Sequence, residues 1–295
     1  SFGLYRATAD LDGKLSRDGK LLYRINLMGM TKGSHRPFDF NNRYTIAPVI
    51  KYLVDEHTSL TAEFTHQFSE VNVIGSNYVF SKSGYADLPR SFTTAEANLP
   101  STKMNDKSLL LIMDHKISKD WKFTAQAAYF NYDQLGASLW PWGFNSANDS
   151  LMQRGMSNWD VLGMTQTGQL FVNGSVQTGI LTHRILAGLD MSNKDYYHDW
   201  NQGGALGAAD FNIYAPVYGT TIIPVFDRSK SLRERGVRYY SGYKAVYVQD
   251  ELGLLNDRLR LTLAGRYTQL TTGDVYNGDF KSSRFTPRAG LSFSA

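Results

Sequence analysis

The 295-residue sequence contains no cysteine. A disulfide framework and a thiolate metal site are therefore excluded, and the cysteine count assigns no redox compartment. The sequence also lacks any run of about 18 apolar residues, the length that a transmembrane helix needs. Its formal net charge of +4 is too small and too dispersed for a nucleic-acid footprint, so we expect no nucleic-acid partner.

Motifs for enzyme chemistry are equally scarce. No Gly-x-Ser-x-Gly nucleophile turn is present. Residues 203–207 are rich in glycine, but they lack the strand-to-helix setting and the downstream acid of a dinucleotide site. Asp55, Glu56 and His57 are adjacent on a turn and do not share one face, which favours a solvated turn over a metal or acid–base site. We therefore expect no catalytic residue, no metal site and no enzyme activity.

Segment 259–268 has the clearest pattern, because its apolar and polar residues alternate strictly. Side chains on a β-strand point to opposite faces in turn, so one face of this strand is apolar and the other carries Arg260 and Arg266. Such a strand fits a position between lipid and water. A short polar turn at residues 256–258 joins it to the preceding strand as an antiparallel hairpin.

Similar hairpins recur along the whole chain and predict about eleven strands. The connections alternate between short and long, and the long ones cover residues 31–42, 69–107, 133–157, 192–236 and 269–283. Up-and-down outer-membrane barrels have this asymmetry, with tight periplasmic turns and large extracellular loops, whereas a soluble β-sandwich does not sort its loops so regularly. The mean hydropathy of -0.34 suits either class. Pro48 lies inside one expected strand and weakens that assignment, because proline is normally confined to edge strands.

The amino-acid sequence of the hairpin that contains segment 259–268 indicates a protein family more specifically than its alternation does. The stretches YVQDE at 247–251, DRL at 257–259 and GRY at 265–267 resemble the hairpin of TonB-dependent siderophore receptors of the ferrichrome type. Further similar stretches, in the family's order, are YRATAD at 5–10, LYR at 22–24, TG at 178–179, GLD at 188–190, FNIYAPVYG at 211–219 and TPRAG at 286–290. No single stretch is specific, but the ordered set is.

This resemblance implies an all-β fold, an antiparallel up-and-down transmembrane β-barrel of about 22 strands in the bacterial outer membrane. Residues 1–295 would supply about eleven of those strands, so we expect them to be part of the barrel domain, with the plug domain, the TonB-contacting segment and the C-terminal strands outside this chain. The implied partners are the TonB complex, the receptor's own plug, outer-membrane lipid and a ferric siderophore.

The implied function is active import of a ferric siderophore, energised by TonB. The ferric siderophore is a transported ligand, and no resident cofactor is expected. Three alternatives stay open: import of another cargo such as cobalamin, a glycan or another metal chelate, a passive porin, and a soluble β-rich binding module.

Aromatic residues of the long connections are the candidate contacts for a bulky ferric chelate, because its own oxygens satisfy the metal and leave apolar surface for the protein. They are Trp140, Trp142, Phe144, Tyr78, Phe80, Tyr196, Tyr197, Trp200, Tyr214 and Tyr218. The alternative for each is packing between loops or a place at the lipid headgroups. Six cations are expected to face the lumen, opposite plug carboxylates and water: Arg6, Arg24, Lys122, Arg184, Arg266 and Arg288.

Overall fold

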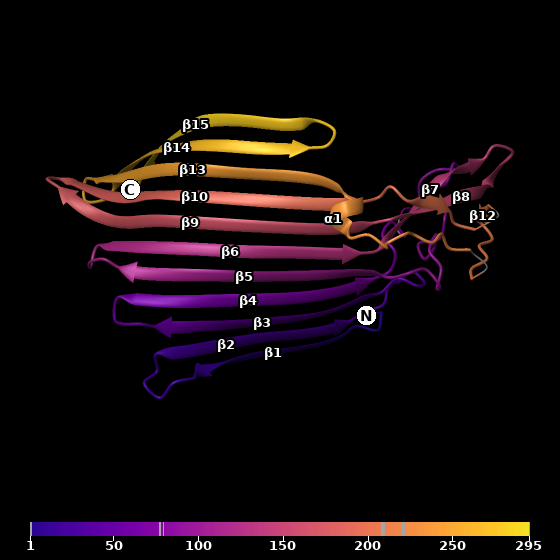
Figure 1. Cartoon of the computed structure of the whole chain (residues 1–295), viewed down its shortest axis with the longest axis horizontal. Coiled ribbons are helices and arrows are strands. Elements are labelled where there is room, and N and C mark those ends of the chain that lie inside the picture. The colour runs from indigo at the N-terminus through magenta and orange to yellow at the C-terminus, as the bar shows by residue number, and fades with distance from the viewer. Residues whose placement is uncertain (1, 77, 79, 208–209, 220–221, 295) are drawn as a thin grey trace.

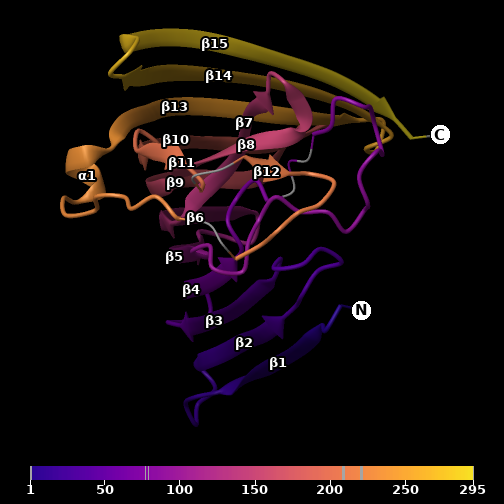
Figure 2. The ribbon, with the colours of Figure 1, turned by 90° about the vertical axis from the view of Figure 1, so that its right-hand side faces the viewer.

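The computed structural model describes residues 2–76, 78, 80–207, 210–219 and 222–294. An eleven-stranded antiparallel sheet, here called the wall, dominates it and curves around one side, as Figures 1 and 2 show. Its strands in spatial order are β1 (Tyr5–Lys14), β2 (Leu21–Thr31), β3 (Asn41–Leu53), β4 (Thr58–Val71), β5 (Thr102–Lys116), β6 (Trp121–Leu135), β9 (Asp160–Thr178), β10 (Leu181–Asp199), β13 (Val237–Leu254), β14 (Leu259–Asp274) and β15 (Gly278–Phe293). The expected fold class and strand number are thereby confirmed.

Two of the long connections contain regular structure that the sequence pattern did not indicate. A small second sheet comprises β7 (Ala137–Asn145), β8 (Asn148–Asn158), β11 (Gly203–Ala205) and β12 (Phe211–Asn212). The one-turn helix α1 (Leu232–Arg235) precedes β13. No helix among the described residues is long and apolar enough to cross a bilayer.

The wall has tight turns at one end and longer connections at the other (Figure 1). The connection between β14 and β15 is an exception, because only residues 275–277 separate these strands, so the long connection expected at 269–283 is wrong. In the turn between β13 and β14, Leu255, Asn256 and Asp257 all have positive φ angles, which lets the chain reverse within a few residues. The expected strand that contains Pro48 is present as β3, and it lies inside the wall rather than at its edge. The β3–β4 pairing is interrupted between Ile46 and Val49, and this gap accommodates a residue that has no backbone N–H to donate.

The two faces of the wall differ in polarity, as the alternation of residues predicted. Residues that pair directly across strands share a face, and one such row joins Leu170, Leu189, Val246 and Tyr267. We call this the outer face; its Leu170, Leu189 and Val246 side chains are 46–54% exposed. An apolar surface of this kind, on a strand whose other face is polar, is what a bilayer-spanning wall presents to lipid.

Polar residues bound this apolar surface at both ends of β13. Towards the tight turns, the apolar surface ends at Asp250, whose carboxylate lies 2.7 Å from His183. Towards the long connections, it ends at Lys244, the first polar outer-face residue in that direction. The six residue steps from Lys244 to Asp250 correspond to about 20 Å of extended strand. We call the surface between them the apolar band.

The buried core of the chain lies in the long connections rather than in the wall. One cluster includes Val73, Leu139, Met156 and Leu206, and an adjoining cluster consists of Phe92, Met152, Phe211 and Ile213. The described residues of segments 72–101, 136–158 and 200–236 therefore form a packed unit, here called the loop domain, beyond the end of the wall (Figures 1 and 2).

Candidate ligand-binding site

An ion-pair network fixes the loop domain to the ends of β9 and β10. The carboxylate of Asp160 is 1% exposed and accepts hydrogen bonds from Arg228 at 2.8 Å and from Arg235 at 2.7 Å. The backbone N–H of Gly136 donates to it as well. Arg235 also pairs with Asp199 at the end of β10. Because a buried carboxylate needs such partners, this network holds α1 and the entry to β7 in place.

A second buried pair lies inside the loop domain. Arg154 on β8 donates to Glu96 at 2.5 Å and to the carbonyl oxygen of Thr94 at 2.7 Å, and both charged side chains are almost completely buried. The backbone N–H of Gly219 donates to the other oxygen of Glu96. The guanidinium also lies 3.9 Å from the ring centroid of Phe211. Three segments far apart in sequence thereby share one buried charge pair, which fixes the shape of the loop domain.

A continuous series of rings runs from this unit to the polar face of the wall, here called the inner face. We call the series the aromatic array; it consists of Tyr78, Trp140, Trp159, Trp200, His198, Tyr239 and Tyr196. Successive ring centroids lie 5.0 Å apart for Tyr78–Trp140, 6.2 Å for Trp140–Trp159, 4.7 Å for Trp159–Trp200, 3.8 Å for Trp200–His198, 5.4 Å for His198–Tyr239 and 6.3 Å for Tyr239–Tyr196. These are ordinary distances for interacting aromatic side chains.

Two strands, β10 and β13, position the lower end of this array. Tyr196 and Tyr239 are direct cross-strand partners on β10 and β13, so both rings project from the inner face at the same level. His198 follows Tyr196 by two residues on β10 and is therefore on the same face. His198 is only 7% exposed, and its Nδ1 atom has no hydrogen-bond partner within the described part of the chain.

The array ends at a cavity of about 340 Å³ on the inner face, here called the inner pocket. Its inner-face lining consists of Thr65, Asp106, Ser108, Phe130, Tyr132, Gly163, Thr165, Lys194 and Tyr196. The Lys194 ammonium lies 5.7 Å from the Tyr196 ring centroid. The pocket therefore combines three aromatic rings, two of which carry phenol groups, with charges of both signs.

Burial shifts the titration of several groups here, all of which lie beyond the apolar band on the side of the loop domain. It raises the pKa of Asp106 above its ordinary value. Burial also raises the pKa of Tyr132, and the neighbouring Asp106 raises it further. The pKa of Tyr196 is raised by burial and by the neighbouring Tyr239. Burial lowers the pKa of His198, and the nearby Asp199 opposes this. At neutral pH the phenols and the imidazole are thus neutral and suited to apolar or planar ligand groups.

Comparison with known proteins identifies the architecture. The family model described as TonB dependent receptor-like, beta-barrel matches residues 52–295. The chain belongs to this receptor family. The receptors of this family are outer-membrane proteins, and the chain is accordingly an outer-membrane protein.

Curated relatives cover the receptor chain but extend well beyond it. The metal-pseudopaline receptor CntO of Pseudomonas aeruginosa is 26% identical over 325 residues, which include 100% of this chain and 42% of the relative. The ferrioxamine receptor of Yersinia enterocolitica is 25% identical over 271 residues, 86% of this chain and 36% of the relative. The chain thus spans about two fifths of the length of these relatives. Both are receptors, and neither is named as an enzyme.

Solved structures share the fold of the receptor chain at low sequence identity. The ferripyoverdine receptor of Pseudomonas aeruginosa, bound to ferripyoverdine, matches 100% of the chain with a TM-score of 0.82 and 17% identity, over 39% of its own length. The ferric preacinetobactin receptor BauA of Acinetobacter baumannii matches 98% of the chain with a TM-score of 0.74 and 14% identity, over 43% of its length.

Four of the ten aromatic candidates lie in the array: Tyr78, Trp140, Tyr196 and Trp200. Trp140 stacks on Tyr78 and is tilted against Trp159, and its indole N–H donates to Ser138 at 2.8 Å. Trp200 stacks on Trp159 and His198 yet remains 42% exposed. An exposed ring whose orientation is fixed by two stacked neighbours is well prepared to bind a ligand.

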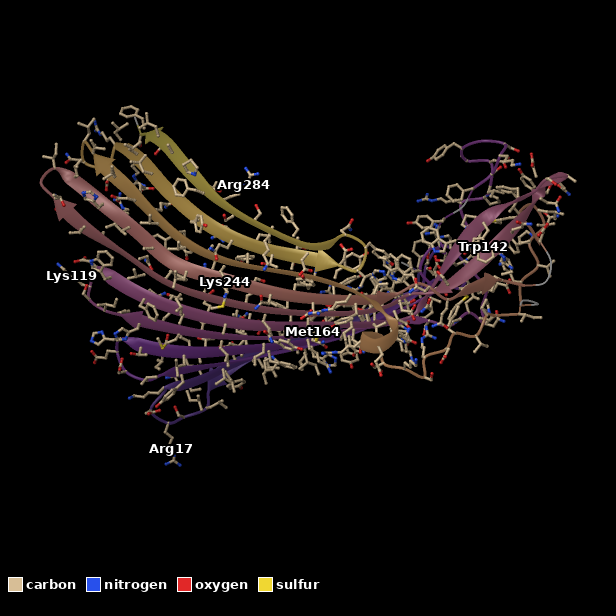
Figure 3. The ribbon with its side chains drawn as sticks, turned by 45° about the horizontal axis from the view of Figure 1, so that its top comes forward. Arg17, Lys119, Trp142, Met164, Lys244 and Arg284 are labelled. Atoms are coloured by element: carbon tan, nitrogen blue, oxygen red, sulfur yellow. The ribbon has the colours of Figure 1, made fainter. Side chains whose placement is uncertain are left out.

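The other six candidates lie elsewhere. Trp142 is 55% exposed on the loop domain (Figure 3), and Phe80 is 54% exposed. Phe144 and Tyr218 pack against the second buried cluster, and the Tyr214 hydroxyl donates to Asp87 at 2.6 Å. Tyr197 projects from the outer face beside Arg233 and Arg238, as the alternative place near lipid headgroups predicts.

The array includes three rings that the sequence analysis did not select: Trp159, His198 and Tyr239. Trp159 lies between β8 and β9, just beyond the segment expected to be a loop. The other two belong to strands that extend further than their alternation indicated. Tyr239 has the same parity as Tyr243 and Tyr247 on β13, and this parity is the one signal that could have placed it on the inner face.

All six cations expected in the lumen lie on the inner face of the wall. Four are paired with carboxylates of the wall itself: Arg24 with Asp10, Lys122 with Asp114, Arg184 with Asp257 and Glu251, and Arg266 with Asp190. The Arg266 pair is bidentate, with two 2.8 Å hydrogen bonds. Arg6 and Arg288 project from the outermost strands β1 and β15. That these groups face plug carboxylates stays a prediction.

Proposed function

We propose that this receptor imports a metal chelate of the siderophore class across the outer membrane, energised by TonB. The observation that carries the proposal is the aromatic array, which connects the exposed ring of Trp200 to the inner pocket without a break. A chelate is a bulky, partly apolar ligand whose own donor atoms hold the metal. Aromatic surface provides contact area for such a ligand at a low cost in side-chain entropy.

The direction of transport and the energy source rest on the family and on the loop asymmetry. Long connections are extracellular in outer-membrane barrels, and tight turns are periplasmic. The loop domain would then meet the chelate first, and the inner pocket would receive it on the way to the plug. The curated relatives extend well beyond the matched region, which leaves room for a plug and a TonB-contacting segment outside residues 1–295.

Import of a metal chelate other than a ferric one is a second candidate. The name of CntO, which the whole chain matches at 26% identity, specifies metal-pseudopaline rather than an iron complex. The ferrioxamine receptor matches at almost the same identity. The inner pocket does not decide between them, because Lys194, Asp106 and two phenols can accommodate ligands of either charge.

The test compares two tryptophans in the full-length receptor. Trp200→Ala removes an exposed ring of the array, and Trp142→Ala removes an exposed ring that makes no ring contact with the array among the described residues. Loss of a central aromatic contact typically costs about 2 kcal/mol, roughly a thirtyfold rise in Kd. Titrations with ferrioxamine B and with metal-loaded pseudopaline should show this rise for Trp200→Ala alone.

Equal affinities for Trp200→Ala and the parent, on correctly folded protein, would remove the array from the ligand site. Uptake of the labelled chelate should also stop in cells that lack TonB. Uptake that continues without TonB, together with ion conductance in planar bilayers, would identify a passive porin instead.

A further inference from the structure

A gap between two aromatic side chains gives the inner pocket a defined shape. Strands β6, β9 and β10 lie side by side in the wall (Figure 1), and Tyr132, Gly163 and Tyr196 are direct cross-strand partners on them. The three residues therefore lie in one row of the inner face, and the middle one has no side chain. All three line the inner pocket. We call the gap between the two phenol rings, with Gly163 at its base, the slot.

The width of the slot matches one flat ring. Two strand spacings separate Tyr132 from Tyr196, which corresponds to about 9–10 Å between their Cα atoms. A planar group that stacks on both rings at an ordinary contact distance of about 3.5–4.0 Å needs about 7–8 Å between them. No ring contact joins Tyr132 to Tyr196 within the described part of the chain, so the two phenols do not close this space themselves.

Both walls of the slot are held by contacts outside it. The Tyr132 hydroxyl donates to Gln134 at 2.6 Å, and the Gln134 amide donates to the carbonyl oxygen of Trp159 at 2.9 Å. Tyr196 is tilted against His198, with 5.7 Å between the ring centroids. The slot is thus formed before a ligand arrives, so binding does not have to order its walls.

A positive charge lies at the side of the slot that is closer to the tight turns. Lys194 precedes Tyr196 by two residues on the same face of β10, and its ammonium lies 5.7 Å from the Tyr196 ring centroid. Asp106 lies beyond Tyr132 on β5, outside the slot. A ring that enters the slot therefore meets an ammonium group, which favours anionic oxygens on the edge of that ring.

We propose that the slot binds a flat aromatic ring of the imported chelate, and that this ring carries anionic metal-binding oxygens, as a catecholate or a phenolate does. The ring stacks between Tyr132 and Tyr196, and Lys194 faces its oxygens. Gly163 determines this preference, because a larger side chain at its position occupies the slot. The inference rests on the proposed function, since it names the chemical class of the chelate.

Gly163 can be replaced within the existing strand, which makes the slot testable. A Cβ atom added there would meet Tyr132 Cβ at 3.6 Å and Tyr196 Cδ2 at 4.0 Å, both ordinary contacts. Gly163→Leu therefore fills the slot and keeps β9. Gly168→Leu is the matched control, because Gly168 lies on the outer face of the same strand and its added Cβ meets Met191 at 3.5 Å, also an ordinary contact.

The experiment titrates the full-length receptor with ferric dihydroxybenzoylserine, whose chelating groups are aromatic catecholates, and with ferrioxamine B, whose chelating groups are aliphatic hydroxamates. The parent should bind the catecholate complex about tenfold more tightly or better, because that complex alone makes two aromatic stacking contacts in the slot. Gly163→Leu should remove this preference by weakening the catecholate complex alone, and Gly168→Leu should keep it. Lys194→Gln should also weaken the catecholate complex, whereas Lys244→Gln on the outer face should not.

The preference of the parent is the decisive measurement, because it does not depend on the folding of any variant. Catecholate binding by the parent that is absent, or no tighter than that of ferrioxamine B, would overturn the slot. A preference that persists in correctly folded Gly163→Leu would overturn it as well. These failures differ from a failure of the proposed function, which would show as uptake that continues without TonB or as a Trp200→Ala variant with the affinity of the parent.

Discussion

Gly155 lies directly beneath the indole of Trp142. A Cβ atom added at Gly155 would stand 1.6 Å from ring atom Cε2 of Trp142. Gly155 is buried, and it is also the cross-strand partner of Trp140. The missing side chain on β8 therefore provides the space in which Trp142 rests, next to the start of the aromatic array.

Gly155→Ala should displace the Trp142 indole and destabilise the loop domain by about 1–3 kcal/mol, the usual cost of overpacking. Tryptophan fluorescence of the full-length receptor should shift in wavelength, and the loop domain should lose protease resistance at a lower temperature. Gly203→Ala is the control, because its added Cβ meets the nearest atom at 3.5 Å, an ordinary contact. Identical behaviour of the two variants would contradict the role of Gly155 as space for Trp142.

Val248 and Gln249 are adjacent on β13 but project from opposite faces of the wall. Val248 is 54% exposed in the middle of the apolar band, whereas Gln249 has the parity of the inner-face residues Tyr247 and Glu251. An arginine facing lipid near the midplane costs about 2–4 kcal/mol. Val248→Arg should therefore lower the free energy of unfolding in liposomes by that amount, and Gln249→Arg should lower it far less. Equal losses would remove the assignment of the two faces.

The strands of the wall were largely predictable, because the sequence patterns that indicate them involve residues close together in the chain. Alternation of apolar and polar residues, as in 259–268, and tight polar turns, as in 256–258, depend on neighbours a few residues away. Pro48 counted against the strand that contains it, but β3 is present, because the interrupted β3–β4 pairing tolerates a proline in an interior strand. The end of β10 was also placed too early, since the part of β10 beyond the apolar band carries polar residues on both faces.

The loop domain and the full array were not predictable, because their contacts join distant segments. Arg154 reaches Thr94 and Glu96 across about 60 residues, and no periodicity signals such a pair. The array likewise depends on pairing between β10 and β13, which aligns Tyr196 with Tyr239 across the chain segment that contains α1. Residue type alone indicated that aromatic rings would gather near the mouth, but it did not indicate which rings would stack.

Arg235→Ala should open the loop domain near β9 and β10. Asp160, which is only 1% exposed, would lose one of its two arginine partners, and Asp199 would lose an ion-pair partner. Breaking a buried pair costs about 3–5 kcal/mol, and because Arg228 remains we expect the lower end of this range. At about 1.4 kcal/mol per decade, local opening becomes roughly a hundredfold more frequent.

Limited proteolysis of segment 200–236 in intact cells measures this opening, since cleavage follows the population of the open form. Arg233→Ala is the matched control on the same helix, because Arg233 is exposed and contacts Met164 and Tyr197 rather than a buried carboxylate. Cleavage of Arg235→Ala at the rate of Arg233→Ala would show that the Asp160 network does not hold the loop domain closed.

Acidification should loosen the aromatic array through His198. Burial lowers the pKa of this imidazole, the nearby Asp199 opposes the shift, and the phenols of Tyr196 and Tyr239 beside it are neutral. The folded state thus binds the proton less well than the unfolded state, whose histidine titrates near about 6.5. The resulting stability is complete above that value and is lost as the pH falls through the lowered pKa. Between pH 7 and pH 5, the fluorescence of Trp159 and Trp200 should change as the stacked imidazole takes up a proton, and chelate affinity should fall in parallel.

In His198→Phe the ring stack is kept and the titrating group is removed, so the pH dependence of both signals should disappear. A pH dependence that persists unchanged in His198→Phe would assign it to another group, and Asp106 in the inner pocket would be the next to test, because burial raises its pKa.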